Sequence, residues 1–496
     1  MRALLVMLLV AGCTDDKYLI VTVNARPAVQ SAESLVVTLT NGGTSRMDTL
    51  SLGGHAFPVT FSVTTPGRTG ELDIQVEAST ADKLVVGNGS GSVTIGATDA
   101  SVMLDSTDFV VNTDYAMDQF LSQDFEANGL QLAATADGHW TAGFRDSCTG
   151  GACTVFGRSF DQDGVPASTT AAAGTNAYEL SSTVTTTTST PALASSGGST
   201  LALWDYYYPS DPTNVHGVAC RAIDAAGNLA ASDALVATDA ADVVAATPLS
   251  NANVAVTWQV YTPNEAIRSV IVKPDCTPLG NVVTVSTTVG STSGPHRAHV
   301  ASNGPVVLYA WIQDNDVHVR TGSNSALTGN DTLLVPHQGT LDVRAVRVTP
   351  MGTGFGVAVR WADTGGGPGK IELYAVSSTG TAMGSAQLVT DQSPSDFYSG
   401  EQAFGIATNA AGRTLIAWHI CDSGGTSCDV FGRLAKADGT MDGAAFMLPT
   451  TTDGDQTGPS VVALPNAFAV AWTDTSHAAP DTQGSAVRAR IYYPPP

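Results

Sequence analysis

Aromatic residues recur along this chain at nearly even spacing, each at the end of a short apolar run such as Val254-Ala-Val-Thr-Trp258. The intervals between successive members run from 50 to 60 residues. A period of about 40 to 60 residues that is built from short strands is typical of a β-propeller or a related array. The pattern therefore predicts seven all-β repeat units. Their marker residues are Phe144, Trp204, Trp258, Trp311, Trp361, Trp418 and Trp472.

Each unit carries four strand-like segments, and sequences such as Val155-Phe-Gly-Arg158 and Val430-Phe-Gly-Arg433 mark the third. The seventh unit stops after its third segment, at Ile491-Tyr-Tyr-Pro-Pro-Pro496. Residues 106–112, ahead of the first unit, have the pattern of the missing fourth strand. Pairing this segment with the last unit closes the ring and removes two exposed sheet edges. We therefore predict a seven-bladed propeller over residues 106–496 that strand 106–112 closes.

The sixth unit also resembles a known class of repeat. Its run from Cys428-Asp-Val-Phe-Gly-Arg433 to Phe446, followed by Asp453-Gly-Asp-Gln, is similar to repeats of large secreted bacterial proteins. Those repeats are predicted β-propellers, usually without a defined activity. The resemblance covers most of residues 106–496 and implies the fold and an extracellular setting, but no substrate.

Residues 13–105 predict a separate small β-sandwich. Apolar and polar residues alternate in Phe57-Pro-Val-Thr-Phe-Ser-Val63 and in Leu72-Asp-Ile-Gln-Val-Glu-Ala78, as in half-buried strands. Further strands are expected at 18–24, 35–40, 83–87 and 92–95, separated by Gly-rich turns. About six or seven short strands is the content of a sandwich. The region resembles the transthyretin- or immunoglobulin-like domains near the start of many bacterial lipoproteins.

The first residues have the form of an export signal. A basic start, Met1-Arg2, precedes an apolar run that ends in Val10-Ala-Gly-Cys13 and is too short to span a bilayer. The run resembles the lipobox of bacterial lipoproteins, which implies removal of residues 1–12 and lipid on Cys13. Thr14 after the cysteine favours the outer membrane or cell surface of a Gram-negative bacterium. An uncleaved apolar tail with an incidental cysteine is the alternative.

The net charge narrows the range of partners. Acidic residues outnumber basic ones by 45 to 22, a formal net charge of −23. Such a surface repels phosphate backbones, so we expect no nucleic-acid partner. A large net charge also keeps chains apart, and we expect a monomer. No later stretch is apolar enough to span a membrane, so we expect membrane attachment through the lipid alone.

Six cysteines remain besides Cys13, an even number in an exported chain. Cys148 and Cys153 flank a short loop in the first repeat, and Cys421 and Cys428 flank the corresponding loop in the sixth. We predict a local disulfide across each loop. Cys220 and Cys276 are left over, and their pairing stays open because their positions in the repeat differ.

Motifs for catalysis and for metal binding are weak. The sequence contains no Gly-x-Ser-x-Gly elbow and no His-Glu-x-x-His zinc helix. Asp161-Gln-Asp-Gly164 and Asp453-Gly-Asp455 fit either ordinary turn chemistry or calcium binding. His296 and His299 are three apart, so a regular strand points them to opposite faces and we expect surface histidines. The repeated Arg158, Arg221, Arg320 and Arg433 fit a structural role at the blade edge or recognition of a phosphate or glycan.

Long connections after the aromatic strands predict the binding face, because variation on one face of a regular scaffold is where binding sites usually lie. Aspartates follow the aromatic within four residues in six repeats, either as turn residues or as an acidic ring that binds a divalent cation. The tyrosine run fits stacking on sugars or a protein, or packing between blades. The candidate residues are Asp146, Asp205, Tyr206, Tyr207, Tyr208, Asp363, His419, Asp422 and Asp474.

Together these features favour a cell-surface lipoprotein that binds or scaffolds a surface protein or glycan without catalysis. We expect no cofactor, with calcium left open. The alternative function is a glycan-acting propeller hydrolase or lyase that uses the same long-loop face.

Overall fold

A computed structural model describes residues 18–113, 118–121, 131–149, 152–170, 172, 174–181, 191–207, 216–224, 227–238, 241–261, 265–287, 294–364, 369–393, 404–421 and 427–495. The side chains of residues 146–149, 152, 153, 207, 216, 242 and 393 are not included. All regular secondary structure in these ranges is β-strand. None of the described residues belongs to a helix long and apolar enough to cross a membrane.

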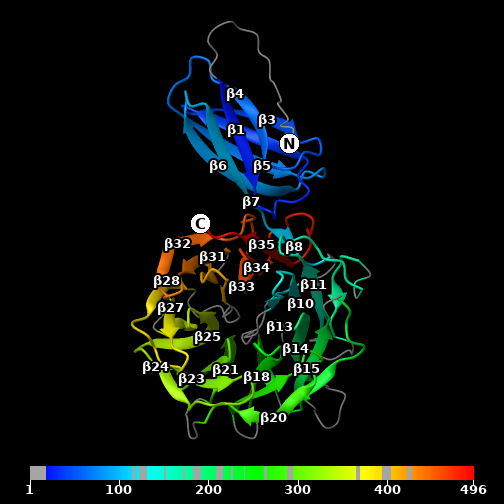
Figure 1. Cartoon of the computed structure of the whole chain (residues 1–496), viewed down its shortest axis with the longest axis vertical. Helices are drawn as coiled ribbons and strands as arrows, with labels where there is room; N and C mark the ends of the chain where they lie inside the picture. The colour runs from blue at the N-terminus through cyan, green and yellow to red at the C-terminus, as the bar shows by residue number, and fades with distance from the viewer. Residues whose placement is uncertain are drawn as a thin grey trace. The chain divides into compact units, whose positions relative to one another are not determined.

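Seven sheets of four strands form the larger part of the molecule, and Figure 1 shows them arranged in a ring. Strands that are consecutive in the chain pair antiparallel within each sheet, so one repeat forms one blade. The predicted all-β fold with a seven-bladed propeller is confirmed. The blades are β9 (Leu132–Ala134), β10 (Trp140–Thr149), β11 (Ala152–Phe160) and β12 (Tyr178–Glu179); β13 (Ala192–Ser196), β14 (Ser199–Tyr207), β15 (His216–Ile223) and β16 (Ala234–Ala237); β17 (Ala241–Pro248), β18 (Val254–Val260), β19 (Ala266–Val272) and β20 (Pro278–Thr284); β21 (His296–Asn303), β22 (Val306–Gln313), β23 (Asp316–Ser323) and β24 (Thr332–Val335); β25 (Leu341–Met351), β26 (Gly354–Asp363), β27 (Gly369–Val376) and β28 (Gln387–Ser393); β29 (Gly405–Thr408), β30 (Thr414–Cys421), β31 (Cys428–Ala435) and β32 (Met441–Met447); and β33 (Gln456–Ala463), β34 (Phe468–Asp474), β35 (Ala486–Tyr492) and β8 (Phe109–Val110).

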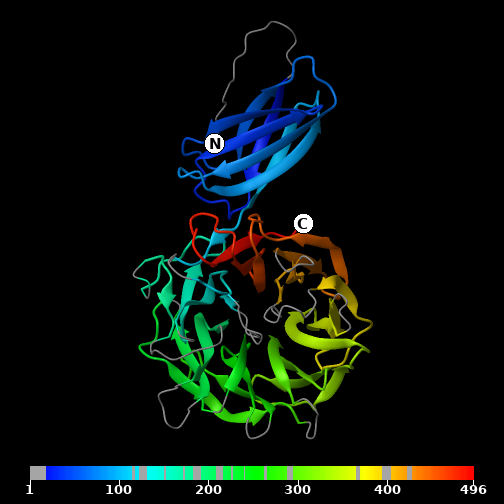
Figure 2. The same cartoon turned by 180° about the vertical axis from the view of Figure 1, so that it is seen from behind.

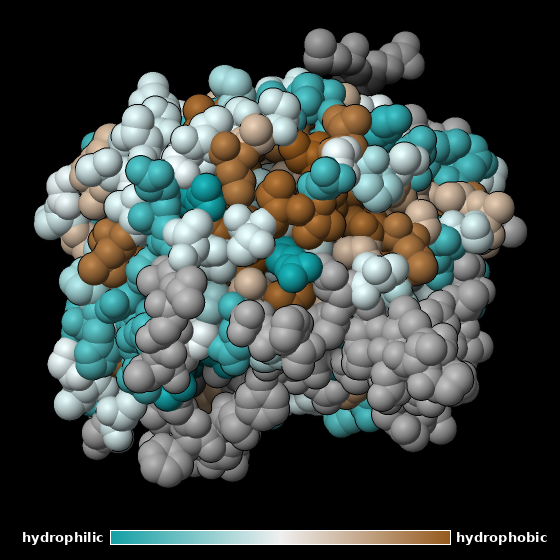
Figure 3. Space-filling model, turned by 90° about the horizontal axis from the view of Figure 1, so that it is seen from below, coloured by the Kyte–Doolittle hydropathy of each residue, from teal (hydrophilic) through white to brown (hydrophobic). Residues whose placement is uncertain are grey.

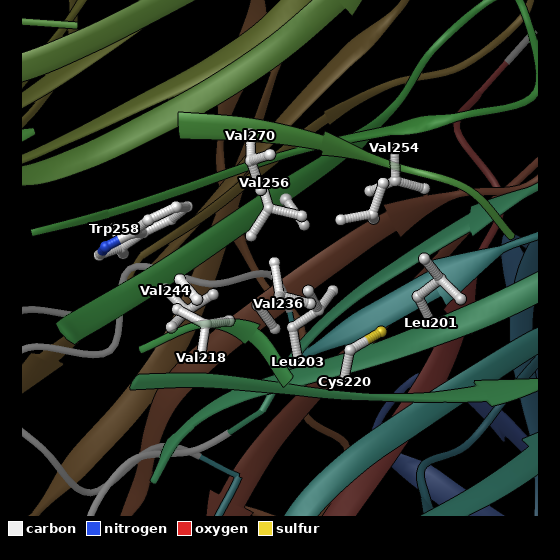
Figure 4. Packing of buried hydrophobic residues seen from close by; sticks show 14 of the residues in the cluster. Leu201, Leu203, Val218, Cys220, Val236, Val244, Val254, Val256, Trp258 and Val270 are labelled. Atoms are coloured by element: carbon white, nitrogen blue, oxygen red, sulfur yellow. The ribbon is translucent and has the colours of Figure 1, made fainter. Parts of the chain in front are cut away.

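The marker aromatics lie on the second strand of each blade and are buried. Trp258 belongs to an apolar cluster that joins the second and third blades, where Leu203 and Val218 pack toward Val256 (Figure 4). Burying a large apolar side chain stabilises the fold by about 1.5–3 kcal/mol, so a regular set of such contacts fixes the blade spacing. Trp140 lies outside the register and is also buried, stacked on Phe160 with ring centroids 4.4 Å apart.

The seventh blade takes its outer strand from ahead of the first repeat. β8 lies within the 106–112 segment and pairs with β35. Just past β8, the Val111 amide donates to the Val487 carbonyl at 2.7 Å. Asn112 is fully buried, donates to Gln119 at 3.1 Å and Asp481 at 2.8 Å, and accepts from the Val487 amide at 2.9 Å. These bonds join the two ends of the repeat array.

The outer strands form the solvent-facing rim of the propeller. β20 is exposed along its whole length. Leu235 on β16, Val283 on β20 and Leu333 on β24 are 51%, 41% and 49% exposed. Figure 3 looks at the side of the propeller that carries β20 in Figure 1. Apolar side chains gather in part of this surface, with polar side chains around them.

Among the described residues of the propeller, four cysteines form two disulfides. Cys220 on β15 bonds Cys276 in the turn after β19, with a sequence separation of 56 and 5.8 Å between their Cα atoms. This bond resolves the pairing that the sequence left open. Cys421 and Cys428 bond across the ends of β30 and β31, as predicted. The structure does not describe the side chains of Cys148 and Cys153, so the disulfide predicted between them stays a prediction.

The N-terminal strands form one curled sheet, shown in Figure 2. The predicted sandwich requires two separate sheets. Here pairing continues through all seven strands because β6 joins β7 and β7 runs parallel to β1. Leu35, Ile74 and Val102 are among the buried residues on its inner side. The strand order is β3 (Thr44–Ser51), β2 (Ser34–Asn41), β5 (Glu71–Ser79), β6 (Val85–Thr94), β7 (Asp99–Ser106), β1 (Tyr18–Ala25) and β4 (Val59–Thr64).

Glycines in β6 explain how this sheet closes up on one side. Gly87, Gly89 and Gly91 alternate along the strand. A Cβ atom at Gly89 would lie 2.1 Å from the Met103 carbonyl oxygen of β7. Only glycine allows β6 and β7 to approach so closely.

The chain divides into two compact structural units. The smaller contains the residues up to Phe109 together with Asp163–Val165 and the C-terminal residues from Arg490. The larger contains Val110–Gln162 and Pro166–Ala489, which is most of the propeller.

Candidate functional site

The predicted binding face lies where the second strand of each blade ends. β14, β26, β30 and β34 carry Asp205, Asp363, His419 and Asp474. Every blade has the same strand order, so these strand ends lie on one face of the ring. Asp205, His419 and Asp474 are buried, whereas Asp363 is half-buried. Burial of three of the four residues favours structural roles for them.

Asp474 takes part in a buried ion pair. Arg488 Nε donates to Asp474 Oδ2 at 2.8 Å, and the two side chains are 4% and 1% exposed. Gln456 donates to Oδ1 at 3.1 Å, and the Ser476 hydroxyl donates to Oδ2. Arg488 also donates to the Ala478 carbonyl. This carboxylate therefore holds the connection after β34 in place.

Tyr206 packs between blades. It is 1% exposed and belongs to an apolar cluster with Val155 and Leu180 of the first blade and Trp204 of the second. Of the two roles predicted for the tyrosine run, Tyr206 has the packing role. The side chain of Tyr207 and the whole of Tyr208 lie outside the described residues.

The predicted acidic ring is only partly described, because the side chain of Asp146 and the whole of Asp422 lie outside the described residues. Within the ranges that the structure covers, no group of three or more His, Cys, Asp or Glu side chains is positioned to hold a metal ion. The turn Asp453-Gly-Asp455 has a structural role, since Asp455 Oδ1 accepts the Cys428 amide at 3.0 Å. Gly454 has a positive φ of 68°, and a Cβ there would meet the Thr475 carbonyl at 2.6 Å.

The repeated arginines of the third strands connect neighbouring blades. Arg433 Nε donates to the Gly443 carbonyl of its own blade, and Nη1 donates to the Val389 carbonyl of the preceding blade, both at 2.9 Å. Arg320 makes the equivalent pair of bonds to the carbonyls of Gly329 and Val285 at 2.8 and 2.9 Å. This geometry favours the structural role at the blade edge over phosphate or glycan recognition. Arg158 and Arg221 bridge in the same way.

His296 and His299 do not follow the predicted alternation, because a β-bulge shifts the register between them. Expecting His299 at the surface was wrong: it is 1% exposed and accepts the Val348 amide of the next blade at 3.1 Å. Burial, and then the charge of Arg347, lowers the pKa of His299 well below its usual value. The imidazole is therefore neutral at neutral pH.

Two buried arginines of the fifth blade, Arg347 and Arg360, were not predicted from the sequence. Arg347 on β25 donates to the Phe404 carbonyl at 3.2 Å, and its guanidinium carbon lies 5.3 Å from the centre of the Phe404 ring. Burial, followed by the charges of Arg297 and Arg360, lowers the pKa of Arg347 to about 9. One sequence signal exists: Arg360 directly precedes Trp361, a place where the second blade has Leu203.

A pocket of about 400 Å³ lies between the first and second blades. It opens beside the turn that joins β9 and β10, where His139 Nδ1 lies 3.2 Å from Asp137 Oδ2 and both side chains are more than half exposed. A hydrogen bond from Thr135, followed by the charge of His139, lowers the pKa of Asp137. Hydroxyl groups dominate the polar lining, which includes Thr135, Thr141, Ser159, Ser168, Thr169 and Thr200.

This hydroxyl-lined pocket was not predicted from the sequence. Its residues come from the turns on the face opposite to the long connections, and each turn by itself is an ordinary Ser/Thr/Gly segment. Part of the hydroxyl set is already bonded: Thr141 Oγ1 lies 3.0 Å from Ser159 Oγ, which lies 2.9 Å from the Tyr178 hydroxyl. The arrangement offers both hydrogen-bond donors and acceptors to a polar ligand.

Comparison with known proteins identifies no family for this chain. No protein-family model and no curated protein matches the chain. Similar solved structures include a protein of unknown function from Dyadobacter fermentans DSM 18053, at 9% identity and a TM-score of 0.43 over 78% of this chain and 98% of that one. Hadza microbial sialidase Hz136 is 8% identical with a TM-score of 0.42, over 97% and 94% of the two chains. A mutant of AofleA from Arthrobotrys oligospora is 9% identical with a TM-score of 0.41, over 70% and 91%.

Proposed function

We propose that this chain is a lipid-anchored binding protein whose propeller holds a neutral, polyhydroxylated ligand such as a glycan, without catalysis. Acyl chains on Cys13 anchor it at the outer membrane or cell surface of a Gram-negative bacterium. Several acyl chains together give stable anchoring where one alone does not.

The two disulfides support the extracytoplasmic setting. Cys220–Cys276 ties two blades together, and Cys421–Cys428 tightens one hairpin. Such bonds form and persist in oxidising compartments and are rare in the cytosol.

The pocket between the first and second blades is the observation that carries the binding role. Its volume of about 400 Å³ falls in the usual range for small-molecule sites. Hydroxyls suit a ligand that both donates and accepts hydrogen bonds. The carboxylate of Asp137 at the mouth suits hydroxyl donors, and a net charge of −23 disfavours anionic ligands.

The test is a glycan array probed with the chain that begins at residue 13 and carries Cys13→Ser. Ser168→Tyr places a large side chain at an exposed position of the pocket lining, and we expect it to weaken binding at least about tenfold. Ser385→Tyr is the control, since Ser385 is exposed in the corresponding connection of the fifth blade, between β27 and β28.

Three outcomes decide the proposal. Loss of glycan binding with Ser168→Tyr alone supports it. Equal binding by both variants, or no binding by the parent chain, contradicts it. Cleaved products detected by mass spectrometry after incubation with the bound glycan would instead favour a hydrolase or lyase.

A further inference from the structure

The curled sheet contains a pocket of its own, about 410 Å³ in volume. It lies between β3 and β4, the two strands at the ends of the sheet order. These are the strands that the curling sheet leaves unpaired on one side. A volume of this size is enough for a small organic ligand or one end of a longer one.

The walls of this pocket are largely apolar. Successive residues of a strand point to opposite faces, so Val37 and Leu39 on β2 and Phe61 and Val63 on β4 face the same interior. Val37 and Val63 are buried, while Leu39, Leu50 and Phe61 are half-buried. The base of the pocket is therefore apolar and buried, and its wall is apolar but still reached by solvent.

Positive charge lies at the rim. Arg46 and Asp48 on β3 form an ion pair with 2.8 Å between Arg46 Nε and Asp48 Oδ2. Arg68, in the loop between β4 and β5, is exposed and has no ion pair with any described residue. Two arginines and one aspartate give the lining a charge of 2 − 1 = +1, whereas the whole chain carries −23. A ligand with an apolar part and an anionic end complements this lining.

An added peptide strand fits this pocket less well. Arg46 and Asp48 point inward from an edge strand, and Pro58 and Pro66 bracket the six residues of β4. Inward charges, prolines and short edge strands are features that protect edges from strand addition. What they leave accessible is the apolar wall.

The start of β1 brings the pocket near the predicted anchor. Tyr18 pairs with Thr64 at the end of β4, and Thr64, Thr65 and Arg68 line the pocket. Tyr18 lies only five positions after Cys13 in the sequence. Five extended residues span at most about 18 Å. An acylated Cys13 therefore holds this end of the sheet at the membrane surface.

We propose that the pocket binds one acyl chain of an anionic membrane phospholipid, whose headgroup phosphate pairs with Arg68. Access to the bilayer rests on the lipid anchoring proposed above. The apolar wall takes the chain by the hydrophobic effect, and the rim selects an anionic headgroup over a zwitterionic one.

The experiment measures binding of a fluorescent probe, dansyl-undecanoic acid, to the non-lipidated chain that begins at residue 13 with Cys13→Ser. We expect saturable binding that phosphatidylglycerol displaces better than phosphatidylcholine. Phe61→Ala removes part of the wall and weakens probe binding about tenfold. Arg68→Ala, at an exposed position, leaves the fold intact and abolishes the preference for phosphatidylglycerol. Met47→Ala is the matched control, since Met47 is 68% exposed on the other face of β3.

Several results would overturn the proposal. The pocket is not a lipid site if the probe does not bind, or if Phe61→Ala and Arg68→Ala both behave like Met47→Ala. Displacement by an uncharged extended peptide but not by phospholipid identifies strand addition. If the probe binds the non-lipidated chain but not the lipidated chain, the acyl chains on Cys13 occupy the pocket in place of a membrane phospholipid. Because the assay needs no anchor and no propeller ligand, its failure leaves the proposed function standing.

Discussion

The propeller and the curled sheet are both antiparallel in most of their pairings, yet they treat their edges in opposite ways. In the propeller, β8 from ahead of the first repeat completes the last blade, and Asn112 and Val111 join it to β35. In the curled sheet, β3 and β4 are each paired on one side only, and a pocket of about 410 Å³ lies between them.

The difference shows where binding capacity arises in such a molecule. In the propeller, disulfides, arginine bridges and buried ion pairs link neighbouring elements, and its pocket is a gap between two blades. In the sheet, no strand of the described residues covers the inner wall between β3 and β4, and apolar side chains there are half-buried. Closure gives the propeller rigidity, and incomplete closure gives the sheet an apolar site.

Removing the closing strand should have the largest effect. Deletion of residues 107–113 strips the seventh blade of β8 and opens a sheet edge in the ring. We expect loss of most of the roughly 5–15 kcal/mol that stabilises a typical domain, with aggregation. Thermal unfolding and light scattering measure both. An unchanged melting temperature would mean that the ring does not depend on this strand.

A buried ion pair in the propeller should matter far more than an exposed one in the sheet. Asp474→Ala leaves Arg488 buried without its carboxylate, at a cost of about 3–5 kcal/mol. Asp48→Ala breaks a pair whose side chains are 34% and 61% exposed, at a cost of about 0–1 kcal/mol. Urea unfolding gives both values. Equal costs would remove the contrast between a packed ring and an open sheet.

The arginine bridges should contribute at an intermediate level. Arg433→Leu removes the donors to Gly443 and Val389 and should cost about 1.5–3 kcal/mol. Arg433→Lys should recover little of the lost stability, because one ammonium cannot reach both carbonyls as the guanidinium does.

Arg68→Ala in the sheet, measured by the same urea unfolding assay, should change the free energy of unfolding by less than about 0.5 kcal/mol. A loss as large as that of Arg433→Leu would contradict the assignment of Arg68 to ligand binding alone.

The pH dependence should be the smallest effect at neutral pH, because buried His299 is already neutral there. Folding lowers the pKa of His299 below the value of about 6.5 that a histidine has in the unfolded chain. Below pH 6.5 the unfolded chain therefore binds a proton at His299 that the folded chain does not bind. Stability is therefore present above pH 6.5 and is lost as pH falls below it. His299→Gln should flatten this part of the profile, whereas exposed His55→Gln should leave it unchanged. Identical profiles for both variants would contradict the role of His299.

Much of the propeller could be predicted because its signal is periodic. Trp258 and Trp472 occupy equivalent positions on the second strands of their blades, so each repeat supports the assignment of the others. Trp140 breaks the register and was not predicted, since it packs on Phe160 in its own blade. The bulge between His296 and His299 could not be predicted either, because a bulge reverses the alternation without a mark in the composition.

The curled sheet was harder to predict because its pairing is long-range. β3 (Thr44–Ser51) is a polar edge strand, so it lacks the alternation that marks a buried one. β6 is one strand, but its glycines indicated a turn between two. The pocket combines residues from four strands, β2 to β5, with neighbouring loop residues, and the strand order brings them together. Nothing in the local sequence specifies that order.

Amide hydrogen exchange on the intact chain tests the contrast between the closed ring and the open sheet most directly. The Val111 amide, bonded to the Val487 carbonyl at 2.7 Å, should exchange as slowly as amides in the middle of the ring, such as that of Val256 on β18. The amides of β4 that do not face β1 should exchange orders of magnitude faster. If Val111 exchanges as fast as those amides of β4, the ring is not closed by β8 and the contrast between the two regions fails.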